Sequence, residues 1–174
     1  MKKLRLEEIT DWCDTVHAGD TLLLTGEIFT ARDAAHKLMC EAISRGESLP
    51  FDIKGKCVYY AGPTGTPPGQ IVGSIGPTTS SRMDKFTPTL LDLGLAAMIG
   101  KGTRNQEVVD SMNKNHALYF CAVGGAGAYI SSCVKSCEVI AYPHLGCESV
   151  KRLYVEDFLV FCGIDTNKNS IFNR

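Results

Sequence analysis

The stretch "DTLLLTGEIFTARDAAHKLMCEAISRG", residues 20–46, decides the fold class because its hydrophobic pattern changes halfway along. Residues 20–30 are mostly apolar and predict a strand, with a turn at Thr25–Gly26. Residues 31–45 have apolar side chains at helical spacing and predict a helix. The residues that share one helical face are Ala34, Ala35, Leu38, Met39, Ala42 and Ile43. A strand that passes directly into a helix is typical of α/β domains.

The ends of this predicted helix carry their own signals. Thr30 and Asp33 have the T-x-x-D form of a capping box, and Gly46 suits the position after the last turn. Arg32 lies in the first turn, where the helix dipole disfavours a cation. A bound anion would offset that cost; the alternative is an arginine that extends into water.

The rest of the chain repeats the alternation of strands and helices. Further strands are predicted at residues 55–63, 95–100, 117–123, 137–143, 150–157 and 158–165. Further helices are predicted at residues 84–94, at residues 105–115 and after a glycine turn within residues 124–135. "VEDF", residues 155–158, is predicted to be a turn between strands. Because the alternation ends in a cluster of strands, we expect one three-layer α/β domain with a mixed sheet over residues 1–174.

The bulk composition argues against several classes of function. The 174 residues carry a formal net charge of −1, which argues against general nucleic-acid binding. No apolar run reaches the length of a membrane span, and the N-terminal "MKKLRLEEITDW" lacks the apolar core of a signal peptide. We therefore expect a cytoplasmic protein that has no membrane or nucleic-acid partner.

The eight cysteines are expected to be reduced and mostly buried, because no secretory signal is present. They lie at positions 13, 40, 57, 121, 133, 137, 147 and 162. No CxxC pair occurs among them. A closed zinc site or a complete iron–sulfur site within this chain is therefore not expected.

A second stretch, "GSIGPTTSSRMDKF" at residues 73–86, has the composition of an anion site. Gly76 permits unusual backbone angles, and Pro77 stiffens the chain. Residues 78–81 offer hydroxyls and amides at a predicted helix start, and Arg82 could hold a carboxylate through two parallel hydrogen bonds. The alternative is a helix cap followed by a solvated arginine.

Lys101 is a third candidate cation, since it lies between two glycines at the end of a predicted buried strand. Ligands favour the carboxyl ends of strands in α/β sheets, although a surface turn would also accept a lysine. "VGGAGAYI", residues 123–130, only begins like a dinucleotide fingerprint, and we interpret it as a tight strand-to-helix turn. His36 is expected to be structural, and His144 is assigned no role.

Five motifs, in order along the chain, resemble the β subunit of class I fumarate hydratase, which forms the C-terminal domain of the single-chain enzymes. These motifs are "LTGEIFTARDAAHK", "YYAGPT", "GSIGPTTSSRMDKFTPTLLDLG", "MIGKG" and "YVEDF". The resemblance begins near Asp20 and continues to the C-terminus. The β subunits of L-tartrate dehydratase are close relatives of this family.

The resemblance implies a swivelling β/β/α domain and a heteromeric hydro-lyase that is active only with its α subunit. The implied cofactor is a 4Fe-4S cluster on that α subunit, with no metal ligand in this chain. By motif, Arg32, Arg82 and Lys101 are implied to bind the substrate's carboxylates, and Thr78 is implied to take part in proton transfer. The implied partners are a fumarase-type α subunit and fumarate or malate, and a homodimer is one state open to the isolated chain.

Two alternatives to fumarate hydration stay open from the residues. Ser80–Ser81 stands where fumarases often show Ala-Gly, and tartrate dehydratases can carry Ser there, so the identity of the diacid is left open. A small-anion binding module without catalysis would need the same cations but would tolerate the loss of the Thr78 hydroxyl.

Overall fold

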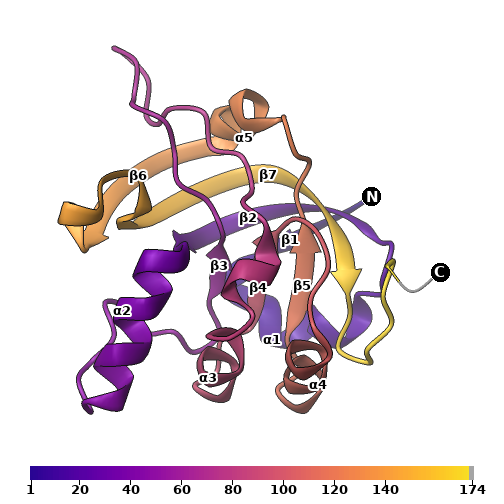
Figure 1. The fold of residues 1–174 in the computed structure, drawn as a ribbon. Coiled ribbons are helices and arrows are strands. Elements are labelled where there is room, and N and C mark those ends of the chain that lie inside the picture. The colour runs from indigo at the N-terminus through magenta and orange to yellow at the C-terminus, as the bar shows by residue number, and fades with distance from the viewer. Residues whose placement is uncertain (173–174) are drawn as a thin grey trace.

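Seven strands form one mixed sheet in the computed structural model, which describes residues 1–172 (Figure 1). The strands are β1 (Lys2–Arg5), β2 (Thr21–Thr30), β3 (Cys57–Tyr59), β4 (Ala97–Gly100), β5 (Leu118–Cys121), β6 (Val134–Ala141) and β7 (Val150–Ile164). The α-helices are α1 (Ile9–Trp12), α2 (Asp33–Ser44), α3 (Thr87–Asp92), α4 (Gln106–Lys114) and α5 (Gly127–Cys133). The 3₁₀ helices are η1 (Leu6–Glu8), η2 (Cys13–Thr15), η3 (Ser80–Met83) and η4 (Pro143–Glu148). The predicted α/β class with a mixed sheet is confirmed.

The sheet closes on itself through its longest strand. The strand order is β1-β2-β3-β4-β5-β7-β6, and β2 pairs with β7 as well as with β3. Pairings from β1 to β5 are parallel, whereas β7 runs antiparallel to β2, β5 and β6. Because β7 pairs with both β5 and β2, the strands β2, β3, β4, β5 and β7 form a closed ring.

The central parallel strands β3, β4 and β5 are buried on both sides. Helices α2, α3 and α4 each connect one parallel strand to the next and lie along one side of them, while β6 and β7 arch across the other (Figure 1). Neighbouring residues of β3 therefore enter different cores. Val58 lies in the core shared with Met39 and Leu90 of the helices, whereas Tyr59 lies inside the ring with Phe158. Burial on both faces explains why these strands are continuous apolar runs in the sequence.

Two predicted turns are wrong, because both positions belong to one β-bulge. Strand β2 continues through Thr25–Gly26, and β7 continues through residues 155–158. The register shifts there, so that Glu156 and Asp157 of β7 lie opposite Thr25 alone, whose hydroxyl accepts a hydrogen bond from the Asp157 amide at 3.1 Å. Gly26 and Asp157 have φ values of +138° and +51°. The irregular backbone therefore bends the β2–β7 ribbon instead of reversing the chain.

The start of α2 also differs from the prediction. The helix begins at Asp33, and Arg32 is its N-cap residue, with no side-chain capping bond. The predicted capping box is therefore wrong: the Thr30 hydroxyl instead accepts a hydrogen bond from the Lys151 amide at 3.1 Å. The Thr30 hydroxyl therefore bonds to the distant strand β7 and does not cap α2. Gly46, with φ +71°, follows the last turn as predicted.

Other boundaries shift for local reasons. Strand β1 is exposed and rich in charged residues, so its sequence has no apolar pattern that would predict it. Strand β3 is shorter than predicted because Ala61 leaves the sheet and bridges to Pro77. Helix α5 passes directly into β6, which begins at Val134 and not at residue 137. Among residues 1–172, no helix has the length and apolar character needed to cross a bilayer.

Candidate functional site

Two of the predicted cations lie at one edge of the sheet because the parallel strands end at the same level. Thr30 of β2 pairs with Tyr59 of β3, Tyr59 with Ile99 of β4, and Ile99 with Phe120 of β5. Arg32 lies two residues beyond Thr30 of this row, and Lys101 lies two residues beyond Ile99, directly after the end of β4. Both therefore emerge from the carboxyl edge of the parallel strands, as predicted.

The segment that contains Thr78 crosses the same edge. Pro77 bridges to Ala61, and the Thr78 amide donates to the Tyr60 carbonyl at 2.7 Å. The segment then pairs with the residue after β4, because Thr79 bridges to Lys101. Thr78 is thus held between the ends of β3 and β4, and no hydrogen bond occupies its hydroxyl within residues 1–172.

Arg82 lies beside the start of α2. The helix start predicted at residues 78–81 is present, because η3 begins at Ser80 with Thr79 as its N-cap residue, and Arg82 is the third residue of this 3₁₀ helix. Its Nε donates to Asp33 Oδ1 at 2.9 Å. Since Asp33 is adjacent to Arg32 in the chain, this contact brings the two arginines to the same end of α2.

In both arginines Nε is the nitrogen nearest a carboxylate, within hydrogen-bond distance for Arg82 and at ion-pair distance for Arg32. Arg32 Nε lies 3.5 Å from Glu148 Oε1, and Arg82 Nε lies 2.9 Å from Asp33 Oδ1. No hydrogen bond to the terminal nitrogens of either side chain occurs in the part of the chain that the structure describes. The end-on fork of each guanidinium, which suits a carboxylate, is therefore unused.

Unpartnered polar atoms concentrate around the start of α2. A buried polar atom without a hydrogen bond indicates a place where water or a ligand supplies the partner. Within residues 1–172, four of the five such side-chain atoms belong to this region: Arg32 Nε, Asp33 Oδ2, His36 Nε2 and Glu148 Oε1. The region is thus built with polar groups that its own fold does not satisfy.

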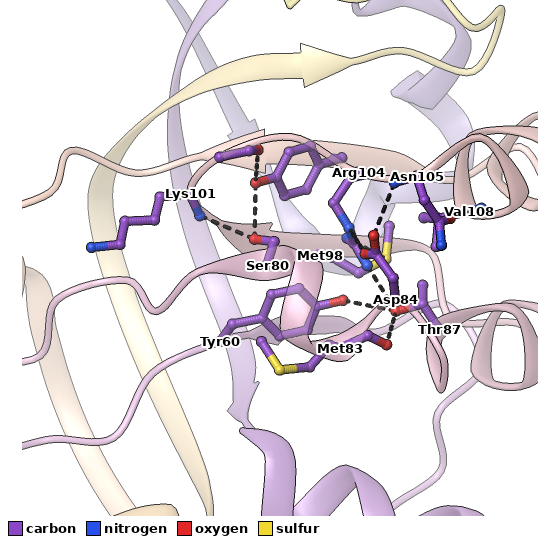
Figure 2. A network of polar contacts seen from close by, with 12 residues as sticks. Tyr60, Ser80, Met83, Asp84, Thr87, Met98, Lys101, Arg104, Asn105 and Val108 are labelled. Atoms are coloured by element: carbon purple, nitrogen blue, oxygen red, sulfur yellow. Dashed lines mark hydrogen bonds and ion pairs between the residues drawn. The ribbon is translucent and has the colours of Figure 1, made fainter.

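Ser80 fixes the segment on the edge of the sheet. Its Oγ accepts a hydrogen bond from the Lys101 amide at 3.0 Å and lies 2.9 Å from the Tyr119 hydroxyl. A Cβ at position 100 would lie 1.9 Å from this oxygen, so only glycine permits the contact. The Lys101 side chain is exposed and extends away from the neighbouring buried polar network (Figure 2). Ser80, which the sequence marks only as a departure from the fumarase pattern, is fully buried and structural.

A buried ion pair, for which the sequence gives no signal, anchors the far end of the segment (Figure 2). Arg104 Nε donates to Asp84 Oδ1 at 2.6 Å, and Arg104 Nη2 donates to the Thr87 hydroxyl at 2.8 Å. Asp84 Oδ2 accepts from the Asn105 amide at 2.9 Å. The pair joins the residue after η3 to the loop after Lys101. Unlike Arg32 and Arg82, Arg104 has its guanidinium nitrogens bound within the fold and is structural.

His36 is buried beneath the first turn of α2 and bonds to the backbone there, so it is structural, as predicted. It is fully buried, and its Nδ1 lies 2.8 Å from the Arg32 carbonyl. Since a carbonyl can only accept, Nδ1 carries the proton and Nε2 is left as an unpartnered acceptor. Burial lowers the pKa of His36 from 6.5 to about 4. The imidazole is therefore neutral at physiological pH and does not act as a cation in the site.

The remaining candidates have no visible part in this site. His144 is exposed in η4. The Gly127 carbonyl accepts a hydrogen bond from the Ile75 amide at 3.1 Å, which fits the tight-turn interpretation of residues 123–130. The eight cysteines are free thiols, and only Cys147 is exposed. Burial raises the pKa of most of these thiols, including Cys162 to about 12. Within residues 1–172, no group of three or more His, Cys, Asp or Glu residues could hold a metal ion.

Comparison with known proteins identifies the family. The family described as "Fumarase C-terminus" matches residues 1–174. The chain is 41% identical over 155 residues to "Fumarate hydratase class I, anaerobic" of Escherichia coli (strain K12), covering 88% of this chain and 28% of that protein. It is 33% identical over 174 residues to "Fumarate hydratase 2" of Leishmania major, covering 99% of this chain and 31% of that protein.

A shorter relative matches along most of its own length. The chain is 34% identical over 162 residues to "Putative L(+)-tartrate dehydratase subunit beta" of Methanocaldococcus jannaschii, covering 90% of this chain and 83% of that subunit. The chain therefore belongs to the fumarase C-terminal family, whose members here are named as hydro-lyases. It spans less than a third of the fumarate hydratases described above.

Removing the buried cation should test the anchor. Arg104→Met leaves the Asp84 carboxylate buried and unpaired, so we expect the free energy of unfolding to fall by about 3–5 kcal/mol. Urea denaturation followed by circular dichroism measures this. Lys114→Met is the matched control, because Lys114 forms an exposed ion pair with Asp92 at 2.9 Å and its loss should hardly move the urea midpoint. Equal effects of the two substitutions would contradict the anchoring role.

The buried neutral His36 should make stability depend on pH. Its folded pKa of about 4 lies below its ordinary value of 6.5, so between these values the unfolded chain binds a proton that the folded chain excludes. Stability should fall by about 2 kcal/mol between pH 7 and pH 5 from this group alone. His36→Asn keeps a donor for the Arg32 carbonyl but does not titrate, so it should remove this pH dependence. An unchanged slope in urea titrations at the two pH values would exclude His36 as its source.

Proposed function

We propose that this chain is the β part of a class I fumarate hydratase, which interconverts fumarate and L-malate. The single observation that supports this most is the pair of arginines at the start of α2, each with Nε paired to a carboxylate of the chain and each with a free fork. Fumarate is a planar dianion with a carboxylate at each end, and such a pair of forks suits it. Lys101, at the same edge of the sheet, supplies a third cation.

The balance of charge at the site favours an anion. Arg32 pairs with Glu148 and Arg82 with Asp33, so the exposed Lys101 leaves a local net charge of +1 in a chain of net charge −1. The charge count supports binding of an anion, and the choice of a dianion rests on the two guanidinium forks. Exclusion of water by a partner covering the edge would strengthen each of these contacts.

Thr78 is the residue proposed to take part in moving the proton. Hydration adds a hydroxyl group to one carbon of the double bond and a proton to its neighbour, and the reverse reaction removes both. The Thr78 backbone is fixed by its bond to Tyr60, and its hydroxyl has no partner within residues 1–172. A threonine hydroxyl is a weak base, so we propose that a carboxylate or histidine of the partner takes the proton from it in the dehydration direction.

We propose that the 4Fe-4S cluster is carried by the α-type partner and not by this chain. Residues 1–172 contain no group of three or more His, Cys, Asp or Glu residues that could hold a metal ion. The chain spans under a third of two relatives named as fumarate hydratases, which leaves most of their length for a cluster-bearing part. We therefore propose a heteromer in the cytoplasm, in which this chain is one swivelling β/β/α domain. The helices on one side of the parallel strands and the β6–β7 arch on the other support that fold.

Tartrate dehydration is a second candidate reaction. The chain aligns with 83% of the length of a protein named as a tartrate dehydratase β subunit, which supports a separate β chain. The same carboxylate-binding geometry would accept a hydroxy-diacid. A binding module that does not catalyse any reaction is the alternative from a different class, and it would not need the Thr78 hydroxyl.

The experiment is a reconstitution of the chain with its α-type partner, assayed against fumarate, L-malate and L-tartrate. We expect the isolated chain to be inactive and the complex to be active. Thr78→Ala should lower kcat by about 10²–10⁴-fold with little change in KM, and Thr78→Ser should keep most of the activity. Fumarate hydration by the isolated chain would contradict the two-part site, and an effect of Thr78→Ala confined to KM would favour a binding module.

A further inference from the structure

Lys151 is a buried cation that binds backbone carbonyls. Its residue is 7% exposed, and its Nζ donates to the carbonyls of Gly146 at 3.3 Å, Cys147 at 3.1 Å and Ser149 at 3.3 Å, and to the Ser149 hydroxyl at 2.7 Å. No carboxylate pairs with it within residues 1–172. All four acceptors belong to residues 146–149, so the backbone of this segment surrounds the ammonium and is held by it.

The segment is held in an unusual backbone conformation. Gly146, whose carbonyl accepts from Lys151 Nζ, has φ +60° and ψ −119°, a conformation that glycine permits. The carbonyl of Ser149 also lies 3.4 Å from the hydroxyl of Thr30, whose oxygen accepts the Lys151 amide. Lys151 and Thr30 therefore contact this segment near both of its ends, at Gly146 and at Ser149.

The same segment packs against Arg32. A Cβ on Gly62 would lie 2.9 Å from the Cys147 carbonyl oxygen and 3.2 Å from Arg32 Cδ, so two backbone segments and the arginine side chain meet where only glycine fits. The next residue, Glu148, lies 3.5 Å from Arg32 Nε. The Arg32 side chain is only 22% exposed and lies between Gly62 and this segment.

We propose that Lys151 is a positioning residue for Arg32. The ammonium fixes residues 146–149, these place Glu148, and Glu148 orients the guanidinium so that its terminal fork faces the carboxylate of the substrate. This role rests on the proposed function, because it assumes that Arg32 binds a dicarboxylate. It also explains why a lysine is buried without a carboxylate: its partners are the carbonyls of the segment that carries Glu148.

The test uses the chain assembled with its α-type partner. Lys151→Met should raise KM for fumarate by about 10-fold and change kcat by less than about 3-fold, because a carboxylate contact is made in both ground and transition states. In an Arg32→Met background the same substitution should change KM by less than about 2-fold, because its effect passes through Arg32. Lys168→Met, which removes only an exposed pair with Asp110, is the control and should change neither constant.

The outcomes separate this inference from the proposed function. An unchanged KM in Lys151→Met, or an equal loss in both backgrounds, would overturn the positioning role while the wild-type activity stands. Lys151→Gln, which keeps two donors, replaces Lys151→Met if that variant does not assemble, and the same criteria apply. Succinate affinity, measured by calorimetry on the same variants, repeats the comparison without turnover. If the wild-type complex binds succinate but turns over no diacid, the proposed function is contradicted and the positioning role of Lys151 is still tested by succinate affinity. If the wild-type complex does not bind succinate, both proposals are contradicted.

Discussion

The alignment of the parallel strand ends is the constraint on which the candidate site depends. Thr30, Tyr59 and Ile99 are paired neighbours in one row, so the chain leaves β2, β3 and β4 at the same level. Arg32 and Lys101 follow two of these strands directly, and the segment that holds Thr78 bridges the ends of β3 and β4. A shift of one strand by a single residue would reverse its inward and outward side chains and separate these groups.

Three contacts between distant segments then convert the edge into a site. The Arg104–Asp84 pair anchors the segment after β3, and the Arg82–Asp33 pair draws that segment to α2. The third contact is the one between Glu148 and Arg32, supported by the Lys151 ammonium. The buried pair is satisfied on all sides, whereas the two pairs at α2 leave the arginine forks free. The fold therefore distinguishes arginines that hold the structure from arginines that are available to a ligand.

The local patterns in the sequence predicted the part of this arrangement that is set by neighbouring residues. The β2–α2 junction, the buried strand before Lys101 and the mixed sheet all follow from hydrophobic periodicity and chain order. The bulge at Thr25 and the ring closure by β7 do not, because each depends on pairing between residues about 130 positions apart. The burial of Lys151 was not predicted for a similar reason. Its contacts depend on how residues 146–149 fold, and no short motif specifies that fold. The helix start near Arg82 was predicted from local residues, whereas the contact of Arg82 with Asp33, 49 positions away, was not.

The most direct measurement is a crystal structure of this chain with its α-type partner, grown with succinate, an unreactive dicarboxylate. We predict that the two carboxylates of one succinate lie within about 3 Å of the terminal nitrogens of Arg32 and Arg82, the distance of a charge-assisted hydrogen bond, with Lys101 and Thr78 facing the same molecule. Succinate bound elsewhere, with Arg32 and Arg82 contacting only protein, would contradict a shared site at the carboxyl edge of the parallel strands.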